Sequence, residues 1–293
     1  MKEELFKSLS PELQDAYIQY CLPDDLSKLT INSVILSEEN REKVNAFLVE
    51  TEYKDKFIRY GLEPVNRILN YGASGTGKTF LTKCLAAHFG YELLSLDINS
   101  AISTGAAAHA IESIFKLGNY LGKCIIFLDE CDVIARDRTD KSIPVKPETR
   151  EAINGIFQLL DRMSPDCIFV AATNLYDELD PAFVRRFNVK LKFDRPVIDE
   201  LDDVINKFVH PAFNINKDME PEIKDIILEY ARNYTGLSYD EIETWVERAE
   251  KQAIIRGSEI IEESEIYKFF MESLRIKVLT NEDDNSLYLY QIS

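Results

Sequence analysis

The chain has 293 residues, 45% of them hydrophobic and 29% charged, which favours a soluble globular protein with a large core and excludes a mainly disordered chain. Its 34 basic and 51 acidic residues give a formal net charge of -17, the wrong sign for a protein that binds a phosphate backbone, so the charge disfavours nucleic acid as a partner. Residues 194 to 293 contain 23 acidic and 11 basic residues, a difference of -12. This acidic last third is either simply solvated or a docking face for a basic partner.

No apolar run approaches the roughly 20 residues that span a bilayer, and the start, MKEELFKSLS, lacks the basic and then apolar order of a signal peptide. We therefore expect a cytoplasmic protein without a membrane partner. The five cysteines occur at unrelated spacings, which predicts buried thiols and neither a zinc site nor a disulfide framework.

The first 28 residues are predicted to be a short helical extension, because residues 3 to 20 have a helical pattern. A brief extended piece is predicted from residue 29 to residue 36. Ser37 then has the position of an N-cap at the start of the next helix.

Between residues 66 and 195, apolar strands alternate with helices. The predicted strands are RILNYG, YELLSLDI, KCIIFLDE, DCIFVAATN and NVKLKF. The predicted helices follow Gly77 and lie around residues 111 to 121 and 150 to 163. This alternation predicts an α/β fold, a parallel sheet with helices on both faces. In such a fold, ligands bind at the carboxyl ends of the strands.

Beyond Pro196 the strand pattern stops. Four amphipathic helices are predicted near residues 198 to 213, 220 to 233, 238 to 257 and 263 to 277. We therefore predict a large domain over residues 29–195, a small all-helical domain over 196–278, and a C-terminal tail over 279–293 that could instead form a closing strand.

The stretch GASGTGKT, residues 72 to 79, matches the phosphate-loop pattern G-x-x-x-x-G-K-[ST] between a predicted strand and a predicted helix. Its glycines let backbone N–H groups point inward at phosphates, and the helix dipole attracts anions. Lys78 is predicted to reach the β and γ phosphates, and Thr79 to hold Mg²⁺. The predicted contacts are Gly72, Ala73, Ser74, Gly75, Thr76, Gly77, Lys78, Thr79 and Phe80. The predicted fold is therefore that of a P-loop NTPase.

The stretch KCIIFLDECD supplies the second half of the predicted site. A buried strand ends in two adjacent acids, Asp129 and Glu130, at the sheet edge where the phosphate loop lies. Asp129 is predicted to bind the Mg²⁺ shell and Glu130 to polarise the attacking water. In-line phosphoryl transfer requires mainly positioning and charge stabilisation, which these residue types provide.

The segments IIFLDECDVIARDR and IFVAATNLYDELDPAFVRRF resemble the AAA family of the AAA+ ATPases, and the resemblance runs from about residue 29 to about residue 272. It implies ATP and Mg²⁺ as ligands, an AAA+ large domain followed by a helical lid, and a homo-oligomeric ring, expected to be a hexamer. It implies that Asn174 helps to position the water. It also implies that Arg185 and Arg186 point into the neighbouring subunit's site, where a cation neutralises transition-state charge. The adjacent pair is similar to that of the microtubule-severing members, katanin and spastin, and which of the two arginines acts stays open.

The segment TGLSYDEIETWVERAEKQAIIRG is similar to the family's lid segment, in which the start of a helix closes over the adenine and ribose. The resemblance implies Gly236, Leu237 and Ser238 as contacts. Val34 and Ile35 resemble the segment that covers the adenine, and the alternative is that they are two ordinary core residues.

Members of this family commonly pull a polypeptide through the ring with an aromatic residue in a loop after the second strand. The matching stretch is SAISTGAAAHAIESIF, and alignment on Gly105 puts Ser103 and Thr104 at the aromatic and aliphatic positions. Either the alignment is shifted by a few residues, or the ring remodels its client without threading it. We favour the second.

We therefore expect an ATPase that remodels or disassembles an unidentified protein partner. One alternative is a nucleic-acid-linked factor of the loader or transposition type, which the acidic charge disfavours. Another is an ATP-bound scaffold, which Glu130 disfavours because a scaffold does not need a water-activating acid. The chain could also work beside a separate protease, since it contains no HExxH or GxSxG motif of its own.

Overall fold

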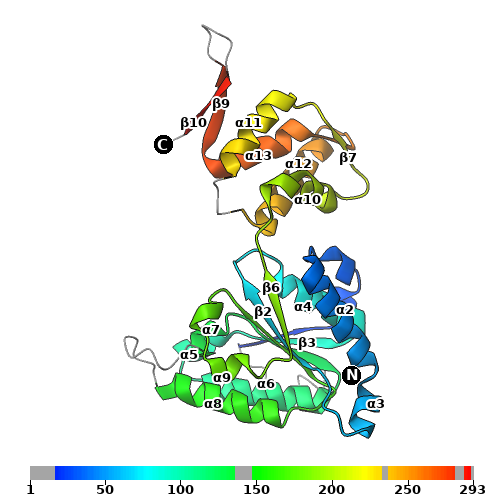
Figure 1. The fold of residues 1–293 in the computed structure, drawn as a ribbon, viewed down its shortest axis with the longest axis vertical. Coiled ribbons are helices and arrows are strands. Elements are labelled where there is room, and N and C mark those ends of the chain that lie inside the picture. The colour runs from blue at the N-terminus through cyan, green and yellow to red at the C-terminus, as the bar shows by residue number, and fades with distance from the viewer. Residues whose placement is uncertain (1–16, 136–146, 233–236, 281–286, 292–293) are drawn as a thin grey trace. The chain divides into compact units, whose positions relative to one another are not determined.

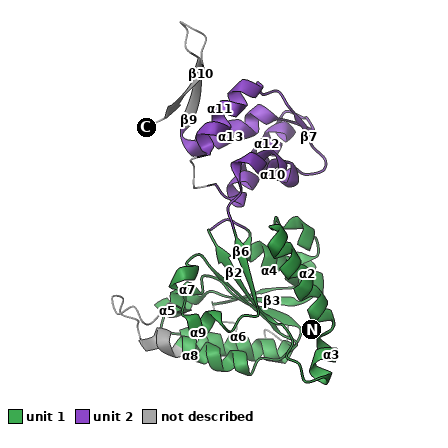
Figure 2. Cartoon of the chain, in the orientation of Figure 1, with its two compact units in different colours: residues 1–73, 77–193 green, residues 74–76, 194–293 purple. Residues whose placement is uncertain are grey.

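The computed structural model describes residues 17–135, 147–232, 237–280 and 287–291 (Figure 1). The chain forms two compact units, residues 1–73 with 77–193 and residues 74–76 with 194–293 (Figure 2). In the described residues, no helix is both long and apolar enough to cross a membrane.

The first unit is built on a six-stranded sheet in the order β1-β3-β4-β5-β2-β6. The strands are β1 (Ile18–Cys21), β2 (Arg67–Gly72), β3 (Glu92–Leu96), β4 (Cys124–Leu128), β5 (Ile168–Thr173) and β6 (Val189–Phe193). β1 pairs antiparallel with β3, and the other neighbouring strands are parallel. The predicted α/β fold with a parallel sheet is thus confirmed.

Helices cover both faces of this sheet (Figure 1). The helices of this unit are α2 (Glu38–Glu52), α3 (Lys54–Arg59), α4 (Lys78–Phe89), α5 (Ile98–Ser103), α6 (Ala107–Leu121), α7 (Asp132–Ala135), α8 (Pro147–Asp161) and α9 (Pro181–Val184), with 3-10 turns η1 (Pro23–Leu26), η2 (Ile31–Ser33) and η3 (Tyr176–Glu178). The predicted N-cap is confirmed, because the hydroxyl of Ser37 accepts the N–H of Asn40 at 3.3 Å at the start of α2.

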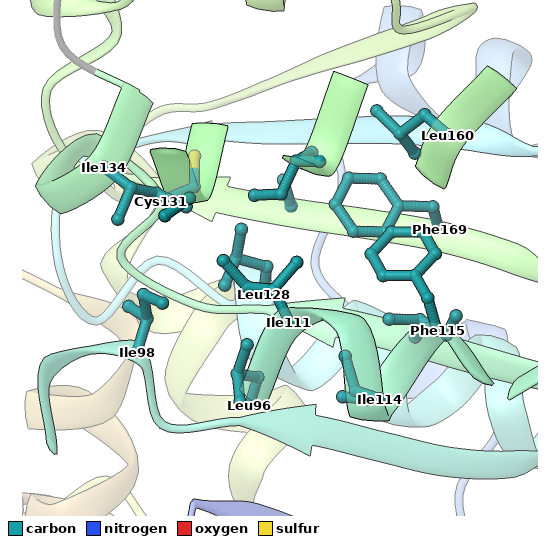
Figure 3. Packing of buried hydrophobic residues seen from close by; sticks show 14 of the residues in the cluster. Leu96, Ile98, Ile111, Ile114, Phe115, Leu128, Cys131, Ile134, Leu160 and Phe169 are labelled. Carbon is teal, nitrogen blue, oxygen red and sulfur yellow. The ribbon is translucent and has the colours of Figure 1, made fainter. Parts of the chain in front are cut away.

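β4 shows how one strand supplies two hydrophobic cores. Ile126 and Leu128 belong to the cluster that includes residues of α6 and α8 (Figure 3), while Ile125 and Phe127 belong to the cluster that includes residues of α2 and α4. All four side chains are at most 2% exposed. Burial on both faces explains why the strand is a continuous apolar run in the sequence.

α2 covers one edge of the sheet. The Nδ2 of Asn40 donates to the carbonyl of Lys192 at 2.7 Å, and the Nζ of Lys43 donates to the carbonyl of Lys190 at 3.3 Å. Both acceptors belong to β6. Side chains of the helix therefore occupy backbone groups that an open edge strand would present to a foreign chain.

β1 covers the other edge and differs from the prediction. The helical pattern predicted for residues 3–20 is wrong at residues 18–20, because these residues pair with β3. Tertiary pairing with an open strand outweighs a weak local preference. Residues 1–16 lie outside the described part of the chain. The extended piece predicted for residues 29–36 contains the 3-10 turn η2.

The second unit contains the four predicted helices, each shorter than expected. They are α10 (Leu201–Phe208), α11 (Pro221–Ala231), α12 (Tyr239–Ile255) and α13 (Glu263–Leu274). The second unit also contains two short strand pairs: β7 (Asn214–Asn216) is parallel to β8 (Ile260–Glu262), which the sequence did not indicate, and β9 (Ile276–Thr280) is antiparallel to β10 (Leu287–Gln291). The alternative of a closing strand over residues 279–293 is therefore closer to the structure than a plain tail.

An ion cluster joins three helices of the second unit. The Nζ of Lys224 in α11 lies 2.5 Å from Asp202 Oδ2 in α10 and 2.7 Å from Glu263 Oε1 in α13. The hydroxyl of Tyr267 donates to Asp202 Oδ1 at 2.8 Å. Because the side chains of Lys224 and Glu263 are only 15% and 8% exposed, the cluster is largely shielded from water.

Candidate nucleotide-binding and catalytic site

The phosphate-loop sequence connects β2 to α4, as predicted. Gly72 ends β2 with a φ of 140°, and a Cβ at this position would lie 2.0 Å from the carbonyl oxygen of Phe193, so no side chain fits. Gly77 is the N-cap of α4 with a φ of 96°, a left-handed conformation that favours glycine. Residues 74–76 cluster with the second unit. The backbone conformations at the start and near the end of the loop therefore both favour glycine.

Lys78 begins α4 and is only 7% exposed. Its Nζ donates to the carbonyl of Gly72 at 2.9 Å and to that of Ala73 at 2.5 Å. These carbonyls hold the ammonium group against the first residues of the loop, where the sequence predicts a phosphate. Phe80, two residues further on, is 37% exposed.

Thr79 and Asp129 meet although 50 residues separate them. The hydroxyl of Thr79 donates to Asp129 Oδ2 at 2.9 Å, and the N–H of Glu130 donates to Asp129 Oδ1 at 3.0 Å. The chain itself thus orients both carboxylate oxygens. Because Mg²⁺ prefers oxygen ligands such as carboxylates and hydroxyls, this pair fits the predicted metal.

Glu130 has a backbone conformation that non-glycine residues rarely adopt, with a φ of 49°. Its side chain is exposed, and its Oε2 accepts a hydrogen bond from the Nδ2 of Asn99 at 2.5 Å. Strained backbone of this kind clusters at functional sites. The motifs did not indicate Asn99, but its place three residues after β3 was a signal, because parallel strands bring their carboxyl ends to one edge.

Asn174 follows β5 directly and is exposed. The preceding Thr173 is 1% exposed; its hydroxyl donates to Asp132 Oδ1 at 2.7 Å and accepts the N–H of Leu175 at 2.9 Å. The segment after β4 is therefore tied to the segment after β5. This brings Asn174 to the sheet edge that carries Glu130.

A cavity of about 320 Å³ lies beside the two acids. Thr79, Asp129 and Glu130 line it, together with residues of β1, β3 and α5. The carboxylate of Glu130 therefore borders open space at the sheet edge.

The two adjacent arginines have different surroundings. The guanidinium carbon of Arg186 lies 3.8 Å from the ring centroid of Phe157, and its Nη1 donates to the carbonyl of Ala182 at 2.6 Å. Arg185 is exposed; its backbone N–H donates to the carbonyl of Pro181 at 3.1 Å, but its guanidinium makes no hydrogen bond or ion pair with any residue in the described ranges. Arg186 is thus held by contacts within its own chain, whereas the guanidinium of Arg185 is exposed.

The residues predicted to contact the adenine belong to both units. Val34 is 4% exposed and lies in the core against α4, and Ile35 is half-buried. In the second unit, Leu237 is buried and Ser238 is the N-cap of α12. Gly236 lies outside the described residues. Their contact with a nucleotide stays a prediction.

The stretch predicted to lack an aromatic grip spans the end of α5. Ser103 is the last residue of that helix, and Gly105 has a φ of 76°. The Oγ1 of Thr104 lies 2.8 Å from the hydroxyl oxygen of Tyr17. The aromatic residue that contacts this stretch is therefore Tyr17, which precedes β1 and does not belong to the loop itself.

A family model and several known proteins resemble the chain over this region. Residues 68–195 match the model of the "ATPase family associated with various cellular activities (AAA)". The chain is 30% identical over 247 residues to an uncharacterized AAA family ATPase, y4kL, of Sinorhizobium fredii, covering 83% of the chain and 71% of that protein.

Two further relatives are longer proteins. The identity is 28% over 240 residues with the ATP-dependent zinc metalloprotease FtsH 1 of Alkaliphilus metalliredigens, and 26% over 250 residues with the ATP-dependent zinc metalloprotease YME1L1 of Mus musculus. These alignments cover 80% and 83% of the chain but only 39% and 34% of the two relatives. The chain thus spans less than half the length of these proteases.

Proposed function

The chain belongs to the AAA family of ATPases, and from that premise we propose that it forms a ring of identical subunits, with six as the expected number, and uses ATP hydrolysis to remodel or disassemble a protein partner. The observation that carries the catalytic part is the contact of Thr79 with Asp129, directly beside the exposed carboxylate of Glu130. The acidic net charge of -17 supports a protein client over a nucleic acid.

In this proposal the residues of the phosphate loop hold the triphosphate. Backbone N–H groups of residues 72–79 contact the phosphates, and Lys78 adds its charge to the β and γ groups. Thr79 and Asp129 hold Mg²⁺, which when bound neutralises charge on the phosphates. Val34, Ile35, Leu237 and Ser238 are proposed to enclose the adenine and ribose.

Glu130 and Asn174 are proposed to act on the attacking water. The carboxylate of Glu130 accepts a hydrogen bond from the water and polarises it, while the amide of Asn174 fixes its position. Attack on the γ phosphorus breaks the bond to the β–γ bridging oxygen, and ADP and phosphate are the products. Positioning supplies most of the rate, so the strained backbone of Glu130 has a functional reason.

Arg185 is proposed to be the residue that enters a neighbouring subunit's site. A guanidinium delivered to the γ phosphate stabilises transition-state charge. The exposure of Arg185 supports this role, and the attachment of Arg186 to Phe157 argues against the same role for Arg186. These two observations support Arg185 over Arg186 for the proposed role.

The substitution Glu130→Gln tests the catalytic proposal. Loss of the carboxylate charge should lower kcat by about 10² to 10⁴-fold while ATP still binds, because the phosphate loop and Asp129 are unchanged. Phosphate release and calorimetric ATP titration measure the two quantities. The matched control is Glu112→Gln on the exposed face of α6, which should leave both unchanged. Wild-type turnover in Glu130→Gln would refute the role of Glu130.

The class of client is tested by stimulation of the ATPase. A permanently unfolded protein such as casein should raise the rate, whereas double-stranded and single-stranded DNA should not. Stimulation by DNA alone would favour the loader or transposition alternative instead. Turnover that is negligible with every addition would favour the ATP-bound scaffold.

A further inference from the structure

We propose that Tyr71 and Tyr176 form a stacked pair that positions Asn174 beside the phosphate loop, which makes both tyrosines positioning residues for hydrolysis. The inference rests on the proposed role of Asn174. Neither tyrosine belongs to the phosphate loop or to the strand-end acids.

The first observation is the ring pair itself. The centroids of Tyr71 and Tyr176 are 4.0 Å apart, and the ring planes meet at 25°, so the rings are stacked. Tyr71 lies in β2, directly before Gly72, and Tyr176 begins the turn η3. The pair therefore joins the start of the phosphate loop to the segment that follows Asn174.

The second observation is the strand register. In the parallel pairing of β2 with β5, Tyr71 lies opposite Thr173. The next residues along the two strands are Gly72 and Asn174, so the backbone places Asn174 level with the first glycine of the loop. A change in the course of the chain after Thr173 would carry Asn174 away from that place.

The third observation is that the residues on both sides of Asn174 are held by contacts, whereas the side chain of Asn174 is not. On one side, Thr173 donates to the buried Asp132 at 2.7 Å. On the other side, the ring of Tyr176 stacks on Tyr71. Within the described ranges, the amide of Asn174 makes no hydrogen bond and is exposed, so it is available to a water while its backbone is fixed.

These contacts explain how a short exposed segment can hold a functional amide. η3 is a 3-10 turn of three residues, and no residue within it is buried. Tyr176 is half-buried and packs against the hydrophobic core that includes residues of α6 and α8. The ring pair adds a contact directly beside the phosphate loop, and displacement of a water-positioning group by about 1 Å is enough to lower a rate substantially.

The test is Tyr176→Leu in the full-length protein, with Tyr176→Phe as the conservative variant. Tyr176→Leu removes the stacked ring, so kcat should fall about tenfold while KM and the Kd for ATP stay within about twofold. Tyr176→Phe retains the ring and should restore kcat. If the contact had only a structural role, Tyr176→Leu would lower the unfolding midpoint of the first unit without lowering kcat at an unchanged KM.

Tyr71→Leu removes the other ring of the pair and should cause the same loss of kcat. The double variant Tyr71→Leu, Tyr176→Leu should be no slower than either single variant, because one contact can be lost only once. In an Asn174→Ala background, Tyr176→Leu should have no further effect. Full additivity with Asn174→Ala, or a raised KM at unchanged kcat, would overturn the inference.

The outcomes also separate this inference from the proposed function. A low kcat in Asn174→Ala together with a wild-type kcat in Tyr176→Leu overturns the positioning pair alone. A wild-type kcat in Asn174→Ala removes the proposed role of Asn174, and the pair with it, but leaves Glu130 and the phosphate loop in place.

Discussion

The two units use polar side chains in opposite ways. In the second unit, Lys224 finds Asp202 and Glu263 within 2.5 and 2.7 Å, so its charge is paired inside the fold. At the carboxyl edge of the sheet in the first unit, Glu130 and Asn174 remain exposed. Paired charges mainly join elements, whereas polar groups with spare hydrogen-bonding capacity can act on a ligand.

The same contrast occurs between two consecutive residues. Arg186 has an aromatic ring and a carbonyl of its own subunit as partners, whereas the guanidinium of Arg185 is exposed. Because residue type and sequence position are nearly the same, these arginines give the strictest test of the contrast.

The largest expected effect is that of Arg185→Ala. If this guanidinium completes a neighbour's site, kcat should fall about 10³-fold. The free energy of unfolding should change by less than about 0.5 kcal/mol, because the side chain is exposed. Phosphate release at saturating ATP and urea denaturation measure the two effects.

Mixing two inactive chains shows whether the arginine acts between subunits. The Lys78→Ala chain lacks the phosphate-binding ammonium but retains Arg185, and the Arg185→Ala chain has the reverse defect. Activity should return where an intact loop faces an intact arginine. Particles that contain both chains and recover no activity would contradict action in trans.

The next largest effect is expected for Lys224→Ala. This change leaves Glu263 buried beside Asp202 without the cation between them, and should lower the free energy of unfolding of the second unit by about 3 kcal/mol. The control is Lys251→Ala, which breaks an exposed pair with Glu247 and should cost less than about 0.5 kcal/mol. Equal costs for the two variants would show that the cluster contributes no more than a surface pair.

The same cluster predicts a dependence on pH. Burial alone would raise the pKa of Asp202, but hydrogen bonds from Lys224 and Tyr267 and the charge of Lys224 outweigh it, so the pKa is lowered. The folded state then binds this proton less readily than the unfolded state. The contribution of Asp202 is therefore fully present above about pH 4 and is lost as the pH falls below that value. The stability difference between wild type and Asp202→Asn should shrink between pH 7 and pH 3 in urea denaturation.

A smaller effect is expected for Arg186→Ala. Loss of the contact with Phe157 and of the hydrogen bond to Ala182 should lower the free energy of unfolding by about 1.5 kcal/mol. Turnover should fall far less than in Arg185→Ala. A loss of turnover as large as that of Arg185→Ala, at unchanged stability, would reverse the assignment of the two arginines.

The smallest effect is expected for Ser238→Ala. The hydroxyl of Ser238 accepts the N–H of Glu241 at 3.3 Å, and the Glu241 carboxylate accepts the N–H of Ser238 at 3.0 Å, a reciprocal cap at the start of α12. Its loss should cost about 1 kcal/mol of unfolding free energy, and Ser238→Thr should recover most of it. An ATP Kd that rises more than about tenfold in Ser238→Ala would mean that nucleotide contact outweighs capping.

The sequence predicted the features that depend on short segments. The strand and helix alternation, the phosphate loop and the two acids after β4 all follow from patterns of fewer than about ten residues, because period and turn chemistry are local. The pairing of Asn99 with Glu130 and the stacking of Tyr71 on Tyr176 could not be read in this way, since each joins segments that only the folded sheet brings together. The strand β1 was missed for the same reason, because its partner β3 is about 70 residues away in the chain.

Phe193 is the last residue of the first unit, and two glycines of the phosphate loop lie against it. A Cβ on Gly72 would be 2.0 Å from its carbonyl oxygen, and one on Gly77 would be 4.0 Å from its ring. The chain leaves for the second unit at residue 194. Because close-packed atoms transmit a displacement rather than absorb it, a change in the loop backbone at Gly72 would displace Phe193, the last residue before the second unit.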